Sequence, residues 1–445
     1  MDFPLNTSSS KNDYPPKKQA RNAVLILALA NVLAFVDRQI PAMLVEPIKQ
    51  DFDLSDSQIA LLGGAAFSLF YALMALPIGY AVDHMKRNRV LGSGIFLWSF
   101  MTVSAIFANT FTKLFGARIG VAVGEAVVAP TSVSLLGDYY PLNKRGTPMA
   151  IITSGVYLGI GISLLGGGYL IDYLTEIGGV TLPLIGHIKP WQAVFLIAGA
   201  PGLLLAVAAF SFKEPVRMHM QHRSESQKSK KAIILHLNNH KATLAPMFAG
   251  FIFMSMIFYS FSFWGPTMML RTFDLTLTEV GATLGIVTIL CSIAGTFLAG
   301  FTVDWLSAKG HKDAPVRAAI YASLLALPMI FLAPLMASVF LSWCLIGLYL
   351  MFISAYATLG LLAVGGMAGA DLRGQLTAVF ALLMMIFGLT LGPQLTAFIT
   401  DFILDDASAL NWSISLTGVL TLPIAALFFK ASLPHYTASI EQMER

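Results

Sequence analysis

The chain is poor in charged residues. Asp, Glu, Lys and Arg make up 12% of its 445 residues, about half the share of a soluble globular domain. Hydrophobic residues make up 56%, and the mean hydropathy is +0.72. This balance excludes a soluble globular protein, gives no basic surface for nucleic acid, and predicts a protein that crosses a membrane many times.

Cysteine is almost absent, and so are the patterns of common enzymes. Cys291 and Cys344 both lie in apolar stretches without a C-x-x-C partner, which excludes a disulfide framework or a cysteine metal site. The sequence has no H-E-x-x-H, no G-x-S-x-G and no phosphate-binding G-x-x-x-x-G-K-[ST]. We therefore expect no enzyme activity, no ATP hydrolysis, no cofactor and no bound metal.

Long runs of apolar residues dominate the sequence. A spanning helix needs about 20 mostly apolar residues. Twelve such runs occur, at 22–46, 57–82, 90–109, 112–137, 147–171, 191–212, 244–269, 278–304, 316–336, 339–367, 375–400 and 409–430. The fold class is therefore an all-α membrane protein. No cleavable signal pattern precedes the first run, which we expect to be retained.

One long connection divides the twelve runs into two sets of six. The expected organisation is a tail, a first bundle, a basic linker, a second bundle and a tail, at 1–21, 22–212, 213–243, 244–431 and 432–445. The linker is either a solvated tether or, at 232–237, a short interfacial helix attracted to anionic lipids.

Basic residues predict the orientation. With the N-terminus inside, 22 Lys and Arg fall in cytoplasmic segments and four in outer loops. Such a bias places both termini in the cytoplasm, and we expect a multi-pass protein of the inner or plasma membrane.

The two halves repeat short motifs at matching places. Three motifs of the first half recur in the second half. FDLS at 52–55 matches FDLT at 273–276, Gly79-x-x-x-Asp83 matches Gly300-x-x-x-Asp304, and Arg145-Gly146 matches Arg373-Gly374. The offsets are 221, 221 and 228 residues. Parallel repeated halves with a site between them are typical of alternating-access carriers.

Four charged residues lie deep inside spans, namely Asp37, Arg38, Arg118 and Glu125. A charge in the bilayer core costs about 2.5–3.5 kcal/mol on insertion scales, so such residues are candidates for function. Counting about 1.5 Å per helical residue places all four in the middle and outer parts of the first half. Arg118 and Glu125 are two turns apart and share one helix face.

These residues suggest coupling to protons. Burial disfavours an ionised carboxylate and a nearby arginine favours it, so a carboxylate whose arginine neighbour moves binds a proton in one state and releases it in another. All eight histidines lie outside the deep spans, which leaves Asp37 or Glu125 to carry the proton. Arg38 can also bind an anionic head group. The alternative is that Asp37–Arg38 and Arg118–Glu125 are static ion pairs that lock helices together, although adjacent residues on one helix do not easily pair with each other. Arg118 is the nearest of the four to the outer surface and could instead reach toward it.

The loop from Gly79 to Arg89 resembles the signature of the major facilitator superfamily: a glycine, an aspartate four residues on, and a basic cluster. His84 and Lys86 depart from its usual arginine and glycine. Within that superfamily, the stretches 36–40, 54–58, 67–71, 124–126 and 199–202 resemble the spinster-like branch. The resemblance implies two six-helix bundles and a proton-coupled carrier. Animal members export sphingolipid and lysophospholipid signals. It also implies coupling roles for Asp37, Arg38 and Glu125.

Charged residues at the cytoplasmic ends form a candidate gate, comprising Asp83, Arg87, Arg89, Asp138, Arg145 and Asp304. The alternative is the ordinary positive charge of inner loops. The second half has no deep charge, and its cavity candidates are polar or aromatic: Tyr259, Trp264, Tyr349, Tyr356 and Gln394. The alternative for these is helix packing.

The function predicted is a proton-coupled secondary active transporter of an amphipathic, lipid-like or anionic substrate. The alternatives are a carrier of small organic anions and a non-transporting sensor built on a carrier scaffold. The partners expected are protons, membrane lipids and the substrate, and the chain is expected to act as a monomer.

Overall fold

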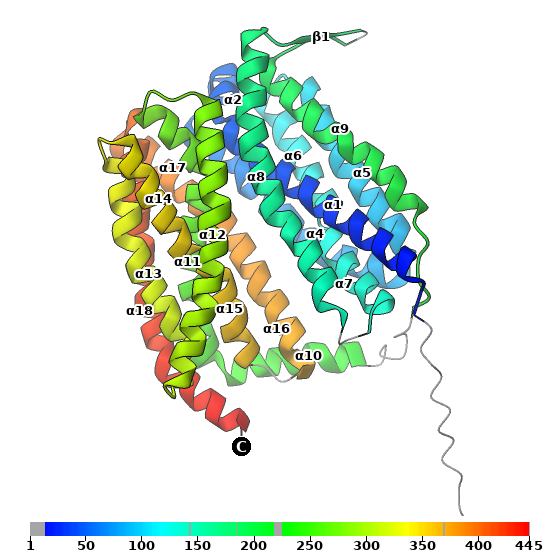
Figure 1. The fold of residues 1–445 in the computed structure, drawn as a ribbon, viewed down its shortest axis with the longest axis vertical. Coiled ribbons are helices and arrows are strands. Elements are labelled where there is room, and N and C mark those ends of the chain that lie inside the picture. The colour runs from blue at the N-terminus through cyan, green and yellow to red at the C-terminus, as the bar shows by residue number, and fades with distance from the viewer. Residues whose placement is uncertain (1–13, 142–143, 184, 218–224, 368–369, 445) are drawn as a thin grey trace, which may run out of the picture.

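The computed structural model describes residues 14–141, 144–183, 185–217, 225–367 and 370–444. These residues are almost entirely helical (Figure 1). Twelve helices or stacked helix pairs among them are long and apolar enough to cross a membrane. The predicted fold class is confirmed: an all-α membrane protein of twelve transmembrane helices in two pseudo-symmetric six-helix bundles.

The first bundle contains α1 to α9. Its helices are α1 (Lys17–Met43), α2 (Val45–Phe52), α3 (Asp56–Gly63), α4 (Ala65–His84), α5 (Arg87–Ser104), α6 (Phe111–Glu125), α7 (Val128–Tyr139), α8 (Gly146–Glu176) and α9 (Pro190–Ser211). Two of its crossings are stacked pairs, α3 with α4 and α6 with α7. A short antiparallel hairpin, β1 (Val180–Leu182) and β2 (Gly186–Ile188), joins α8 to α9.

The second bundle follows α10 (Glu225–Asn239). Its helices are α11 (Lys241–Thr272), α12 (Leu277–Ala308), α13 (Ala314–Leu332), α14 (Val339–Ile353), α15 (Ala355–Gly366), α16 (Ala370–Leu383), α17 (Thr390–Phe398) and α18 (Leu410–Glu444). Two π-helical segments, Met384–Leu389 and Ile399–Leu404, flank α17. Helices suit a membrane because each bonds its own backbone polar groups.

Corresponding helices of the two bundles begin in the same way. The Ser55 side chain accepts the amide of Gln58 to start α3, and the Thr276 side chain accepts the amide of Glu279 to start α12. In both, the glutamine or glutamate side chain bonds back to the cap residue, which completes a capping box. The repeated FDLS and FDLT motifs therefore encode matching helix starts.

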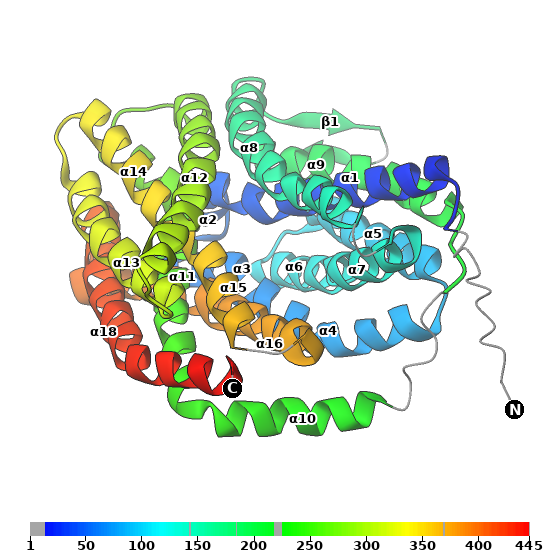
Figure 2. The ribbon, with the colours of Figure 1, turned by 60° about the horizontal axis from the view of Figure 1, so that its bottom comes forward.

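The bundles stand side by side (Figure 1). We call the end that carries β1 and β2 the hairpin side, and the end that carries α10 and the C-terminus the termini side. The ribbons of the two bundles meet at the hairpin side and diverge toward the termini side (Figure 1). In Figure 2, α10 runs across the termini side, outside the spanning helices.

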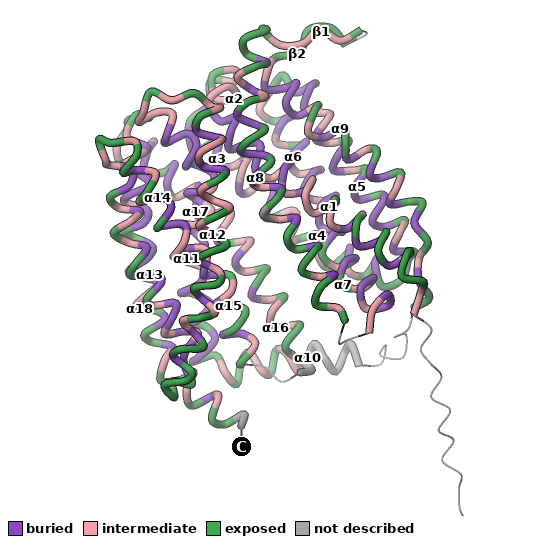
Figure 3. Tube along the Cα trace, viewed as in Figure 1, coloured by how far each residue is buried: buried purple, intermediate pink, exposed green. Residues whose placement is uncertain are grey.

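Burial follows the bundle interiors (Figure 3). Large apolar side chains remain exposed on the outer faces, as at Leu76 (83% exposed) and Phe340 (75%). An apolar outer surface around a packed interior is what a lipid environment requires, because lipid tails replace water against these side chains.

The predicted spans match the structure to within a few residues, except at the last one. Helix α18 continues past the predicted end at 430 to Glu444. The extension has a buried face: Tyr436 is 1% exposed and its hydroxyl donates to the Ala363 carbonyl at 3.0 Å. The linker holds a 15-residue helix, longer than the predicted 232–237.

Candidate functional site

The four deep charges come together, as their depths predicted. Arg38 on α1 donates from Nε to Oε2 of Glu125 on α6, at 2.6 Å. Glu125 is fully buried, and its second oxygen, Oε1, has no hydrogen-bond partner. The pair thus joins two helices of the first bundle and leaves one carboxylate oxygen unsatisfied.

Asp37 lies next to this pair but bonds elsewhere. Its Oδ2 accepts from the Thr102 hydroxyl at 3.0 Å, and its Oδ1 is buried without a partner. Arg118 donates from Nη1 to the backbone carbonyl of Asp37 at 3.2 Å. Adjacent residues on α1 therefore bind α5 and α6 separately.

Arg118 corrects two sequence interpretations. Its side chain is only 3% exposed, so it does not reach toward the surface. Its bond goes to a backbone carbonyl, and the carboxylate of Glu125 pairs with Arg38 instead. Helix periodicity places Arg118 and Glu125 on one face, but only the packing of α1 against α6 decides which arginine is within reach.

Arg38 connects the buried carboxylate of Glu125 to a cavity. Its guanidinium lies 4.7 Å from the ring centres of both Phe35 and Phe67, and 5.2 Å from that of Tyr71. Its side chain remains 23% exposed and lines the cavity. Aromatic faces attract a planar cation, so these rings hold the guanidinium in place between Glu125 and the cavity.

The cavity lies between the bundles and measures about 310 Å³. The first bundle contributes mainly Phe35, Arg38, Gln39, Phe67 and Arg118. The second contributes aromatic, hydroxyl and apolar groups, among them Tyr259, Ser262, Phe263, Thr288, Tyr356 and Met385. A wall that carries two arginines thus faces a wall of mixed aromatic, hydroxyl and apolar side chains.

The cavity candidates of the second bundle fall into two groups, those that line the cavity and those that do not. Tyr259 and Tyr356 line the cavity, as predicted. Trp264 and Tyr349 are fully buried in the bundle, where Trp264 donates to the Pro393 carbonyl and Tyr349 to the Ile257 carbonyl. These two are packing residues, and Gln394 is not among the lining residues either. Composition alone does not show which face of a span meets the cavity.

One residue next to the buried charges, Gln39, makes a contact from the first bundle to the second. Gln39 donates from Nε2 to the Ser262 carbonyl at 2.9 Å, and the Ser262 hydroxyl donates back to Gln39 Oε1 at 3.2 Å. Sequence reasoning missed this contact because neither residue is charged. Asp37, Arg38 and Gln39 therefore bind three different helices in succession.

On the termini side, Arg87 is the centre of the candidate gate. It is 1% exposed and bonds Asp138 through Nη1 and Glu214 through Nε, the latter at 2.9 Å. It also donates to the Pro215 carbonyl. The pairing of Arg87 with Asp138 brings two predicted residues together. Glu214, on the linker, was missed.

The other gate candidates lie apart from this centre. Asp83, Arg89 and Asp304 are exposed. Arg145 donates to the carbonyls of Gly137 and Tyr140, which end α7. It is Arg217, on the linker, that reaches the Asp83 segment, by donating to the backbone carbonyls at the end of α4.

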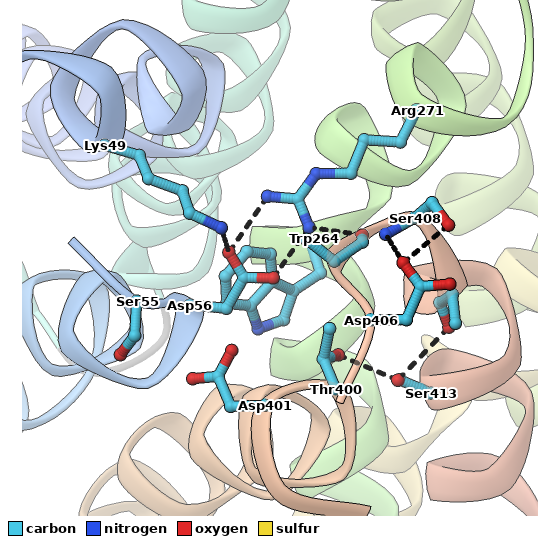
Figure 4. Close-up of polar contacts among 12 residues, drawn as sticks. Lys49, Ser55, Asp56, Trp264, Arg271, Thr400, Asp401, Asp406, Ser408 and Ser413 are labelled. Carbon is cyan, nitrogen blue, oxygen red and sulfur yellow. Dashed lines mark hydrogen bonds and ion pairs between the residues drawn. The ribbon is translucent and has the colours of Figure 1, made fainter. Parts of the chain in front are cut away.

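On the hairpin side, an ion-pair network joins the bundles (Figure 4). Asp56 of α3 is fully buried, and Arg271 of α11 donates to both of its oxygens, at 2.6 and 2.9 Å. Lys49 also donates to Asp56, and Arg271 Nε donates to Glu46 at 2.6 Å. Sequence reasoning counted Lys49 and Arg271 only as outer-loop charges.

The comparisons with known proteins agree with this geometry. The family model described as Major Facilitator Superfamily matches residues 27–393. The chain belongs to the major facilitator superfamily. Among curated relatives, an MFS-type efflux pump of Mycolicibacterium smegmatis is 26% identical over 428 residues, covering 95% of this chain and 93% of that protein.

Two further relatives of this superfamily member match less of the chain. The sphingosine-1-phosphate transporter SPNS2 of Xenopus tropicalis is 34% identical over 168 residues, 37% of this chain and 32% of that protein. A probable L-galactonate transporter of Escherichia coli is 24% identical over 313 residues, 68% of this chain and 65% of that protein.

Among solved structures, a bacterial homologue of the human lysosomal transporter Spinster, inward-facing and unoccupied, has a TM-score of 0.77. It is 24% identical, over 96% of this chain and 98% of that one. The predicted resemblance to the spinster-like branch is confirmed. The relatives are transporters, so this chain is a membrane transporter and not an enzyme. Within the described residues, no cluster of three or more His, Cys, Asp or Glu can hold a metal.

Proposed function

We propose that the protein is a proton-coupled secondary transporter that works by alternating access and carries an amphipathic anion through the central cavity. The observation that carries the proposal is the position of Arg38, which binds the buried carboxylate Glu125 on one side and lines the cavity on the other.

This arrangement can couple protonation of a buried carboxylate to substrate binding in the cavity. While Glu125 is ionised, it holds Arg38 by a charge-assisted bond. When Glu125 takes a proton, its attraction for Arg38 falls, and the guanidinium becomes available to an anionic group in the cavity. Asp37 has an unpartnered buried oxygen as well, so it is a second candidate for the proton.

The cavity lining supports an amphipathic substrate. A guanidinium suits a phosphate or carboxylate head group, and the opposite wall offers Tyr259, Phe263 and Tyr356 to an apolar chain. The local likeness to a sphingosine-1-phosphate transporter agrees with a substrate of this class.

A small organic anion is the second candidate. Polar groups also line the cavity, at Gln39, Ser262, Thr288, Ser292 and Ser354, and they suit a polyhydroxylated acid. The likeness to a probable L-galactonate transporter favours this reading.

The orientation proposed rests on the basic residues. With 22 Lys and Arg in the segments that the sequence predicts to be cytoplasmic and four in the predicted outer loops, both termini face the cytoplasm of an inner or plasma membrane. The bundles then meet at the outer side and diverge inward. We propose that one chain is the working unit, because the cavity is built from the two bundles of a single chain.

The test is reconstitution in proteoliposomes that hold a pH-sensitive dye. Addition of a lysophospholipid, or of L-galactonate in parallel, is expected to change the internal pH with the parent protein. Asp37→Asn and Glu125→Gln are expected to abolish the change, and Glu176→Gln, at an exposed acid of α8, to preserve it. Binding without any flux identifies a sensor and refutes transport coupling.

A further inference from the structure

Two helices start at the contact between the bundles on the hairpin side. The first residue of α3 is Asp56, and that of α12 is Leu277. The first amides of a helix have no partner within the helix. In each case the cap side chain takes the amide of the third residue, and the amide of the second residue, Ser57 or Thr278, needs another acceptor.

That acceptor comes from the opposite bundle in both helices. Asp401, on the segment after α17, accepts the Ser57 amide at 2.7 Å. Asp172, near the end of α8, accepts the Thr278 amide at 2.8 Å and the Thr278 hydroxyl at 2.7 Å. Each carboxylate faces the partial positive charge at a helix N-terminus.

The two contacts correspond to each other in the internal repeat. Ser57 and Thr278 are 221 residues apart, the offset of the FDLS and FDLT motifs. Asp172 and Asp401 are 229 residues apart, within one residue of the offset between the two Arg-Gly pairs. Each bundle therefore gives one carboxylate and one helix start to the other.

The surrounding packing brings these groups into reach. At the seam between α8 and α12, a Cβ on Gly168 would lie 2.3 Å from the Leu277 carbonyl oxygen, and one on Gly281 would lie 2.3 Å from that of Leu164. Glycine is required on both helices for this approach. The ion pair between Asp56 and Arg271 lies beside the contact between α3 and the segment after α17, close to Asp401 (Figure 4).

We propose that Asp172 and Asp401 form a paired latch that holds the hairpin side closed, and that both bonds break together when the cavity opens to that side. The proposal rests on the alternating access proposed above. Donor and acceptor belong to different bundles, so any rocking that separates the bundle ends breaks both bonds. Water then solvates the freed groups, which keeps the cost of opening low enough for a cycle.

The latch can be tested by measuring the opening of the hairpin side without any substrate. Spin labels are placed at Thr112→Cys and Ala337→Cys, exposed positions of the two bundles on that side, in a background carrying Cys291→Ser and Cys344→Ser. Distances are recorded by double electron–electron resonance in lipid nanodiscs. The parent is expected to give mainly the short distance between the two labels that corresponds to a closed hairpin side.

Asp172→Ala and Asp401→Ala are each expected to raise the ratio of long to short distances about two- to thirty-fold, the range for loss of a helix cap. The double variant is expected to raise it further. Asp274→Asn, at an exposed acid of the same side, is the matched control and is expected to change nothing.

Distance distributions identical to the parent in both alanine variants, each with a parent-like thermal midpoint, overturn the latch. If either variant fails to fold, Asp172→Asn and Asp401→Asn replace it, because asparagine keeps an acceptor and loses the charge. They are expected to give a smaller shift in the same direction, and no shift overturns the proposal. Proton flux is not part of this readout, so failure of the latch and failure of proton coupling are distinguishable.

Discussion

The Nε atom of Arg38 lies 2.6 Å from Oε2 of Glu125, while the same guanidinium lines the cavity between the bundles. One side chain thus touches both the buried acid and the space where a substrate would sit. In the proposed cycle, the proton on Glu125 and the anion in the cavity act on each other through Arg38.

Removing Arg38 tests the energetics of this pair. Arg38→Ala leaves a buried carboxylate without its counter-charge, and we expect a loss of about 3–5 kcal/mol of stability. The loss should shrink in acidic buffer, because a protonated Glu125 needs no counter-charge. Thermal unfolding in detergent across a pH series measures both effects. Adding Glu125→Gln to Arg38→Ala should recover most of the loss; an equally unstable double variant contradicts the pairing.

Exchanging Arg38 for lysine tests anion recognition. Arg38→Lys keeps the charge but loses the planar group held by Phe35 and Phe67, so we expect affinity for an anionic ligand to fall about ten- to a hundred-fold, the equivalent of about 1.5–3 kcal/mol. A thermal-shift titration with lysophospholipid and with L-galactonate measures the change. Equal affinity in the variant would show that the substrate does not contact this guanidinium.

Two tyrosines of the second bundle should behave in opposite ways. Tyr356→Ala, at the cavity wall, is expected to weaken ligand binding more than it lowers the thermal midpoint. Tyr349→Phe removes the bond to the Ile257 carbonyl and should cost about 0.5–1.5 kcal/mol of stability with ligand affinity unchanged. The same thermal-shift assay reports both quantities, and a reversed pattern would contradict the assignment of cavity and packing roles.

On the termini side, Arg87 and Arg89 form a matched comparison. Arg87→Ala removes the buried guanidinium that pairs with both Asp138 and Glu214, and we expect a loss of about 3–5 kcal/mol of stability. Arg89 is exposed, so Arg89→Ala should change stability by less than about 0.5 kcal/mol. Unfolding midpoints of the two variants, each compared with the parent, measure the two losses of stability. Similar midpoints would mean that the buried pairing of Arg87 contributes little to stability.

The class of protein, the number of spans and the doubled organisation can all be read from the amino-acid sequence. Each of these follows from local chemistry: about 20 apolar residues suffice to cross a bilayer, and matching motifs recur at matching places. The choice of Asp37, Arg38, Arg118 and Glu125 as candidate site residues also follows from sequence, because a charged side chain at that depth is costly whichever way it points.

Which side chains meet depends on how the helices pack in three dimensions. This packing paired Arg38 with Glu125, turned Tyr259 and Tyr356 toward the cavity and Trp264 and Tyr349 away from it, and set Asp172 and Asp401 against helices of the opposite bundle. Depth along a span is a property of one helix, whereas a contact depends on the rotation of two helices about their axes. That rotation is set by packing along whole helix faces, through residues distributed over the entire chain.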